Sequence, residues 1–134
     1  MKELYQKIQR YNYKINQIVS MQFEGFISFM TLMSFRLNDT LEIGASENKV
    51  ISKGEFIMWH TIIPPDKDID TPSFQQHYHN CIETIDIISG ELTNAVNNEK
   101  KGPGGQMKFI HGEIHHPINL GEENVVCNVK HYRG

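Results

Sequence analysis

The stretch QHYHNCIETIDIISG, residues 76–90, decides the fold predicted for this chain. It holds two histidines two positions apart, His77 and His79, followed by Glu83. Alternate side chains of a β-strand point to the same face, so the two imidazoles are expected to lie together. A turn at Asn80 would let Glu83 return a carboxylate from the next strand to the same point. Two imidazoles and a carboxylate that converge in this way are a common site for a divalent transition metal.

A second histidine group lies downstream in the stretch HGEIHHPIN, residues 111–119. Either His115 or His116 could add a further nitrogen to the site formed by the first stretch. These neighbours point to opposite faces of a strand, and alternation alone does not choose between them.

The chain around these stretches alternates short strand patterns with turn signals rich in Gly, Pro and Asn. About nine short strands at this spacing are typical of an all-β sandwich or barrel. The predicted strands are Thr40–Ile43, Lys49–Ser52, Glu55–Ile63, Phe74–His79, Glu83–Ile88, Leu92–Asn97, Gln106–Ile110, His115–Asn119 and Asn124–His131.

The first stretch resembles the first motif of the cupin superfamily. That motif has two His separated by one residue, then three or four residues, Glu, six residues and Gly. This chain supplies His77, His79, Glu83 and Gly90 at those spacings, and departs from the motif only at its leading Gly, where Thr71 stands.

The second stretch is similar to the second cupin motif, which runs Gly, about five residues, Pro, one residue, Gly, two residues, His, three residues and Asn. This chain has Gly104, Gly112, His115 and Asn119 in register, with Ile110 in place of the Pro. The alignment with the motif selects His115 over His116.

The resemblance covers residues 41–134 and implies a cupin-type double-stranded β-helix, a jelly-roll barrel, with a metal in its mouth. A site of three nitrogens and one oxygen disfavours Mg²⁺ and Ca²⁺ and suits one divalent ion of Fe, Mn, Ni, Co, Cu or Zn. Four protein ligands leave positions open for a small-molecule ligand. The implied metal ligands are His77, His79, Glu83 and His115.

The function expected from this resemblance is that of a metal-dependent enzyme, an oxygenase, decarboxylase or isomerase, acting on a small organic metabolite. The alternatives are a non-catalytic binding or sensing module, and a structural protein that has kept the motif, because a fold does not fix a function. Cys81 is expected to be a buried thiol, and His111, His116 and His131 are expected to lie outside the ligand set. Further residues expected to line the barrel or bind the substrate are His60, Ile85, Ile87 and Asn119.

Residues 1–40 lie outside the resemblance and are predicted to form a separate N-terminal helical extension of the barrel domain 41–134. Apolar residues recur at helical spacing from Leu4 to Ile18, which favours a helix. After Gly25 the pattern also fits a strand, and helix is favoured only weakly there. The helix is expected to pack on its own domain or a partner subunit, with a membrane-surface helix as the alternative.

Composition limits the classes of function. The 134 residues carry a net charge of −3, which argues against a nucleic-acid binder. The longest uncharged apolar window, residues 25–35, is too short to span a bilayer, and the start of the chain does not read as a signal peptide. With only two Cys, a reduced cytoplasmic protein is expected. A homodimer is also expected, because the resembling single-domain cupins pair through their sheets and the apolar helix face needs cover.

Overall fold

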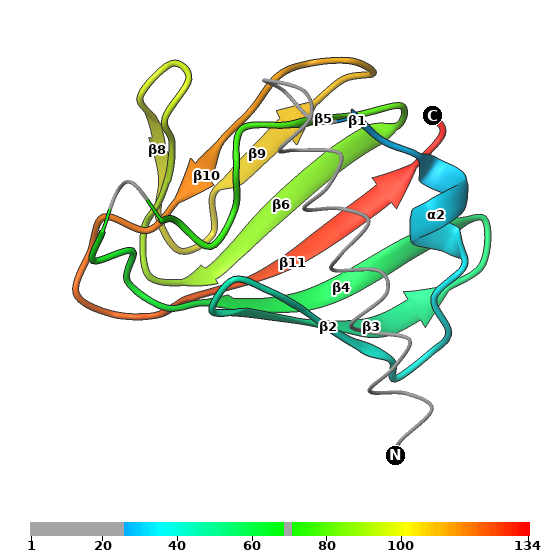
Figure 1. Ribbon diagram of the computed structural model, residues 1–134, viewed down its shortest axis with the longest axis horizontal. Helices are drawn as coiled ribbons and strands as arrows, with labels where there is room; N and C mark the ends of the chain where they lie inside the picture. Colours follow the sequence, from blue (N-terminus) through cyan, green and yellow to red (C-terminus); the bar gives the residue numbers. More distant parts are fainter. Residues whose placement is uncertain (1–25, 69–70) are drawn as a thin grey trace.

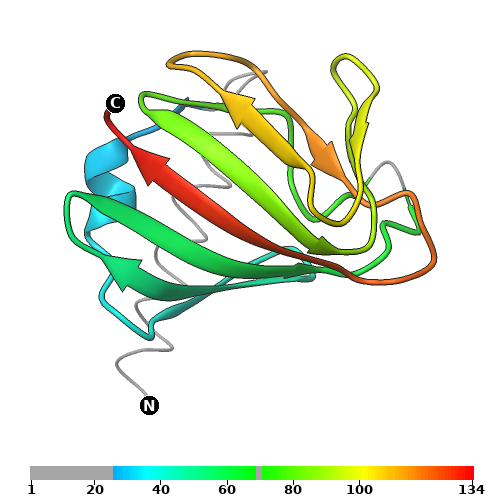
Figure 2. The same cartoon turned by 180° about the vertical axis from the view of Figure 1, so that it is seen from behind.

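The computed structural model describes residues 26–68 and 71–134 of the chain. Its main element is a six-stranded antiparallel sheet with strand order β2-β3-β4-β11-β6-β9. Figures 1 and 2 show these strands running side by side from the two opposite views. The strands are β2 (Thr40–Ile43), β3 (Ser46–Lys53), β4 (Phe56–Ile63), β11 (Val125–Tyr132), β6 (Ile82–Ser89) and β9 (Gln106–Phe109).

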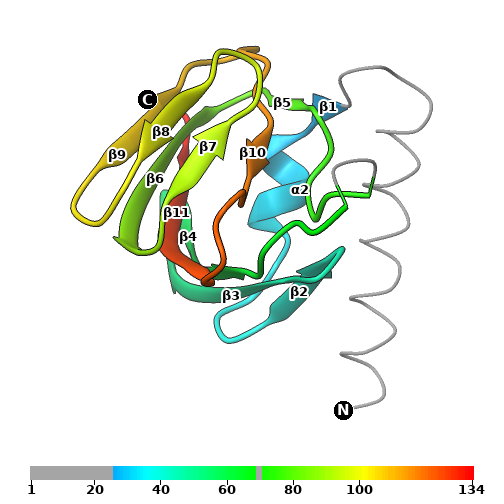
Figure 3. The same ribbon diagram turned by 90° about the vertical axis from the view of Figure 1, so that its left-hand side faces the viewer.

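Two smaller sheets face the large one. An antiparallel sheet has strand order β10-β7-β8, and a parallel pair joins β1 to β5. In Figure 3 the large sheet curves, and β7, β10, β5 and α2 lie on its concave side. These elements are β1 (Phe26–Ile27), α2 (Phe29–Met33), β5 (Tyr78–His79), β7 (Leu92–Asn94), β8 (Glu99–Lys101) and β10 (Pro117–Ile118).

The core fills the space between these sheets, and strict alternation along the strands decides which residues enter it. In β4 the odd-numbered residues from Ile57 to Ile63 are buried, and in β11 those from Val125 to His131 are buried. Their even-numbered neighbours are only partly buried. This two-residue period is that of a sheet with one face on the core, and it confirms the predicted all-β class.

The segment before β2 joins the same core. Ile27, Phe29, Leu32 and Phe35 are all buried, and Phe35 packs edge-on against Trp59 with ring centroids 5.3 Å apart. The helix predicted for residues 1–25 lies outside the described residues. Beyond Gly25 the chain forms a two-residue strand and the five-residue α2. The predicted domain division at residue 40 stays a prediction.

Strand boundaries differ from the prediction where turns intervene. The predicted strand Phe74–His79 contributes only its last two residues to a ladder. The predicted strand Leu92–Asn97 ends at Asn94, because the chain turns at Asn98, whose φ of 62° is left-handed, and returns as β8. Asn tolerates this conformation better than most residues, so the sequence carried a turn signal there.

The structure explains why the last residue of the first motif, Gly90, is a glycine. It follows β6 with a φ of +81°, and a Cβ at this position would lie 2.6 Å from the backbone oxygen of Asn124. Only glycine allows both this conformation and this close approach of the two segments.

Within the part of the chain that the structure describes, no helix has the length and hydropathy required to cross a lipid bilayer.

Candidate metal centre

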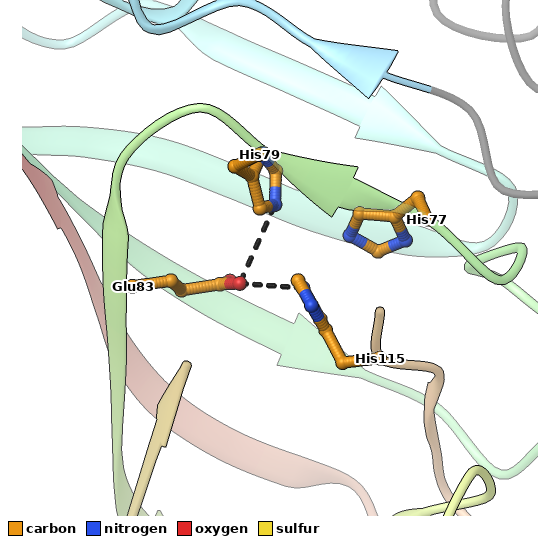
Figure 4. Close-up of side chains that lie close together, drawn as sticks. All are labelled: His77, His79, Glu83 and His115. Carbon is orange, nitrogen blue, oxygen red and sulfur yellow. Dashed lines mark ion pairs between the residues drawn. The ribbon is translucent and has the colours of Figure 1, made fainter. Parts of the chain in front are cut away.

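Backbone pairing brings the two histidine stretches together. His77 and His115 form an isolated antiparallel bridge, with the amide of each donating to the carbonyl of the other at 3.0 and 2.9 Å. His79 follows in β5, and after the turn at Asn80 and Cys81, Glu83 enters β6 on its buried face. Figure 4 shows the four side chains converging from these segments.

The four side chains predicted as ligands are all buried, and one potential ligand atom from each lies within 4.8 Å of the others. Glu83 is at the centre: its Oε2 is 2.6 Å from His115 Nε2 and 3.3 Å from His79 Nε2. The structure therefore brings His77, His79, Glu83 and His115 to one point, and of the two candidates from the second stretch it selects His115.

The backbone fixes two of these imidazoles with Nε2 available. His77 Nδ1 lies 2.6 Å from the carbonyl oxygen of Gln75, and His115 Nδ1 lies 2.9 Å from that of Glu113. A carbonyl only accepts, so Nδ1 carries a hydrogen in both rings and Nε2 is the nitrogen that remains for another partner. This is the usual arrangement around metal-binding histidines. The ring of Phe109 stacks on His115 with centroids 4.2 Å apart and holds its plane.

The cluster leaves buried polar atoms without hydrogen bonds. Among the described residues, those atoms are both ring nitrogens of His79, Glu83 Oε2, His115 Nε2 and His131 Nε2. Within this set, Glu83 Oε2 and His115 Nε2 form an ion pair at 2.6 Å. Leaving buried polar groups unpaired is costly. Atoms of this kind at ligand distances from one another fit a divalent transition metal, which would satisfy them.

Protonation of the cluster follows from burial and from the central carboxylate. Burial lowers the pKa of His77 well below its usual range, and the neighbouring rings of His115 and His79 lower it further. Burial also lowers the pKa of His79 to about 4, although Glu83 opposes the shift. These two imidazoles are therefore neutral at physiological pH, the state in which a histidine binds a metal.

Glu83 and His115 shift each other's pKa values in opposite directions. Burial alone would raise the pKa of Glu83, but the imidazoles of His115 and His79 hold it well below its usual range. Burial would lower the pKa of His115, but the Glu83 carboxylate raises it above the ordinary value. The pair therefore favours a carboxylate beside an imidazolium, and a metal ion at this point would displace the imidazolium proton.

His131 is a fifth residue of this cluster, and the sequence analysis did not place it there. It pairs directly with Glu83 across the β11–β6 ladder, and its Nε2 lies 3.5 Å from Glu83 Oε1. Trp59 donates its indole N–H to His131 Nδ1 at 3.2 Å, which leaves Nε2 on the side of the Glu83 carboxylate. The alternation of Val125, Cys127 and Val129 could have indicated that His131 faces inward, but not that it meets Glu83.

A cavity adjoins the cluster. Its volume is about 80 Å³, and its walls are mostly aliphatic and aromatic. Ile85, expected to line the barrel, is among the wall residues. Segment 26–35 supplies Ile27 and Leu32, which the sequence analysis had not assigned to a site. The lining residues include Ile27, Leu32, Leu41, Ile43, Asn48, Trp59, Thr61, Ser73, Gln75, Ile85, Cys127, Val129 and His131.

Three residues expected to bind substrate lie elsewhere. His60 occupies the face of β4 opposite Trp59 and pairs with Asn128 at 3.1 Å between Nδ1 and Oδ1. Ile87 is in the core but not among the cavity's lining residues. Asn119 is buried and donates to the carbonyls of Ile63 and Glu123, which ties the chain after β10 to the end of β4. The motif Asn therefore has a structural explanation.

The two cysteines are buried, and the two remaining histidines of the second stretch are hydrogen-bonded outside the cluster. Cys81 and Cys127 are free and buried, and burial raises the pKa of each thiol to about 12. His116 Nε2 bonds to the carbonyl of Phe74 at 2.9 Å, and His111 Nε2 to that of Arg133 at 2.8 Å. Neither histidine belongs to the cluster, because the ring of each is bonded to a carbonyl outside it.

Comparison with solved structures identifies the fold. The chain is similar to a cupin-2 domain protein from Shewanella frigidimarina, with 18% identity, a TM-score of 0.53, and coverage of 64% of this chain and 79% of that one. It is also similar to an RmlC-like cupin with a double-stranded β-helix from Methanocaldococcus jannaschii, at 15% identity and a TM-score of 0.54, covering 67% and 82% of the two chains.

A third similar structure is a sugar phosphate isomerase of the cupin superfamily from Silicibacter pomeroyi, at 17% identity and a TM-score of 0.55, covering 69% and 62% of the chains. No protein-family model matches the sequence, and the comparison with curated proteins gave no match. The fold is thus the cupin double-stranded β-helix, as the resemblance implied, and the buried cluster of three histidines and one glutamate lies inside it.

Proposed function

We propose that the protein is a metal-dependent enzyme that binds one divalent transition metal ion through His77, His79, Glu83 and His115 and acts on a small organic metabolite in the adjoining cavity. The observation that carries this proposal is the convergence of four buried side chains whose potential ligand atoms lie within 4.8 Å of one another, three of which have buried atoms without a hydrogen bond. An oxygenase, a decarboxylase and an isomerase are all compatible with such a centre.

When bound, a divalent metal polarises a substrate oxygen or lowers the pKa of a water molecule. The protein's own part is to hold the ligands and to exclude water. The carbonyls of Gln75 and Glu113 orient two of the rings, and Phe109 stacks on the ring of His115. The aliphatic walls desolvate whatever lies beside the cluster, which strengthens electrostatic interactions there.

Elemental analysis of protein purified without a histidine tag is the first test, and about one metal ion per chain is expected. Two adjacent histidines then supply a matched pair. His115→Gln should weaken metal binding in a chelator competition by more than about 100-fold, because it removes a ligand. Substitution of residues that only orient the ligands of a metal site already lowers metal affinity by about 10–100-fold. His116→Gln should leave affinity nearly unchanged. A wild-type protein that takes up none of Fe, Mn, Ni, Co, Cu or Zn would refute the proposal.

A non-catalytic binding or sensing module is the second candidate, and one observation favours it. Among the cavity-lining residues that the structure describes, His131 and the thiol of Cys127 are the only titratable groups apart from the cluster's ligands. An enzyme of this kind has few groups besides the metal for proton transfer. A ligand that raises the melting temperature of the metal-loaded protein, without turnover under aerobic or anaerobic conditions, would favour this candidate over the enzyme.

We further propose a cytoplasmic homodimer. The two free, buried cysteines are compatible with a reducing compartment. Exposed apolar side chains such as Leu37, Ile110 and Leu120 offer surface for a partner subunit. Sedimentation velocity at micromolar concentration should show the dimer mass, and a monomer under these conditions would contradict the dimer.

A further inference from the structure

The size of the cavity limits its occupant. A water molecule needs about 10–15 Å³ of such cavity volume, so about 80 Å³ has room for about five to eight waters. A ligand that fills this space therefore has about the same number of non-hydrogen atoms. This is the size of a short-chain metabolite rather than a sugar phosphate or a nucleotide.

Among the described residues that line the cavity there is no Lys or Arg that could pair with an anionic ligand. The side chains that cover most of it are hydrocarbon, such as Leu41, Trp59 and Val129. Of the polar side chains outside the cluster, Ser73 and Gln75 are uncharged. A charged group placed against these walls would be desolvated without a partner, which is costly.

The two most buried polar residues of the wall outside the histidine and glutamate cluster have already used their donors. Asn48 donates from Nδ2 to the carbonyl of Leu41 at 3.1 Å and to Ser46 Oγ at 3.2 Å. Thr61 donates its hydroxyl to Asn48 Oδ1 at 2.8 Å. This leaves Asn48 and Thr61 only lone pairs to offer, and an anionic oxygen beside them would meet acceptors. The wall formed by β3 and β4 therefore repels carboxylate and phosphate groups.

The proposed metal ion and its ligands set the charge at one end of the cavity. The two positive charges of a divalent ion, less the one negative charge of Glu83, leave one positive charge at that end of the cavity. We infer that the cavity takes a small molecule with at most one anionic group, located at the metal end, and with an aliphatic body against the walls. This inference rests on the proposed metal site, and it excludes dicarboxylates and phosphorylated compounds as ligands.

Two 2-hydroxy acids test this class directly. The probes 2-hydroxy-3-methylbutanoate and malate share a carboxylate with a hydroxyl group on the adjacent carbon. The first carries an isopropyl group beyond it, and malate carries a second carboxylate. The full chain is loaded with Zn(II), which has no redox chemistry. Trp59, the chain's single tryptophan, lines the cavity and reports binding by its fluorescence, with the melting temperature as a second readout. The isopropyl acid should bind at least tenfold more tightly than malate.

A charge placed in the wall should shift this preference. Ile43 lines the cavity at a partly buried position, where a lysine can keep its ammonium group partly hydrated at the edge of the cavity and near a ligand inside it. Ile43→Lys should narrow or reverse the ratio of affinities, and Ile43→Met, an uncharged side chain of similar volume, should preserve it.

The outcomes separate the two proposals. Malate binding to the wild type as well as the isopropyl acid does, a ratio that Ile43→Lys leaves unchanged, or no response to either acid while Zn(II) stays bound would each overturn the ligand class and leave the metal site standing. Failure of Zn(II) to bind, measured separately by chelator competition, would refute the proposed function and with it this inference.

Discussion

The buried neutral imidazole of His79 should make the metal-free protein sensitive to mild acid. The folded pKa of about 4 lies below the ordinary value of 6.5, so near pH 5 the unfolded chain binds a proton that the folded protein does not. Stability therefore falls as pH drops through 6.5. From pH 6.5 to pH 5, at about 1.4 kcal/mol per pH unit, His79 accounts for a loss of roughly 2 kcal/mol.

Its neighbours contribute in known directions. His77, whose pKa is also lowered, adds to the loss at acid pH. His115 opposes it, because a raised pKa contributes stability that is present at low pH and is lost as pH rises through its folded value. The lowered pKa of Glu83 contributes stability that is lost only at pH values below the ordinary carboxyl range, so it stays in place at pH 5. A comparison of the wild type with a His79 variant isolates the contribution of His79 to the pH dependence of stability.

The assay is urea unfolding at pH 7.5 and pH 5 in the presence of a chelator, for wild type and His79→Gln. The difference in unfolding free energy between the two pH values should be smaller in the variant by roughly 2 kcal/mol. This corresponds to about 1 M in the urea midpoint at an m-value of about 2 kcal/mol/M. Ile85→Val, which trims a non-titrating wall residue, should cost about 0.5–1.5 kcal/mol equally at both pH values. An unchanged pH dependence in His79→Gln would refute the reasoning.

Three further predictions concern the turn after β6 and the metal cluster. Gly90→Ala should destabilise the protein by roughly 1–3 kcal/mol in urea unfolding, and by more than Gly104→Ala, which shares the positive φ but has open space around its Cβ; equal losses would contradict the role assigned to the close approach. His131→Gln should weaken Co(II) binding by about 10–100-fold and change the visible Co(II) spectrum, because it disturbs the orientation of Glu83; an identical spectrum and affinity would exclude this positioning role. Metal binding below the raised pKa of His115 should release its proton, seen calorimetrically as heats that depend on the ionisation enthalpy of the buffer, and buffer-independent heats would rule this out.

The local features of the site could be predicted from sequence because they depend on short-range geometry. The shared face of His77 and His79 follows from strand alternation, and the return of Glu83 follows from the turn at Asn80. The choice of His115 over His116 needed the spacing of a known motif. In the structure it reflects the bridge from His115 to His77, a contact between segments almost forty residues apart, which alternation cannot predict.

Residues whose role depends on register could not be placed in the same way. His131 faces Glu83 only because β11 pairs with β6 in one particular register, and no local pattern fixes that pairing. His60 was expected near the cavity, but Trp59 and Thr61 occupy the inward positions of β4 and place it on the other face. The five-residue α2 has too few residues to be stable alone, and packing of Phe29 and Leu32 on the core stabilises it.

The strap formed by β1 and α2 gives the protein two separately adjustable parts. Ile27 pairs with His79, one of the proposed metal ligands, across the β1–β5 ladder, and Ile27 and Leu32 line the cavity from a segment outside both histidine motifs. Substitutions in this strap can therefore reshape the space beside the metal cluster while every ligand stays in place. Evolution or a protein engineer could therefore change the ligand preference of this barrel through one short stretch of chain. The residues proposed to hold the metal would not have to change.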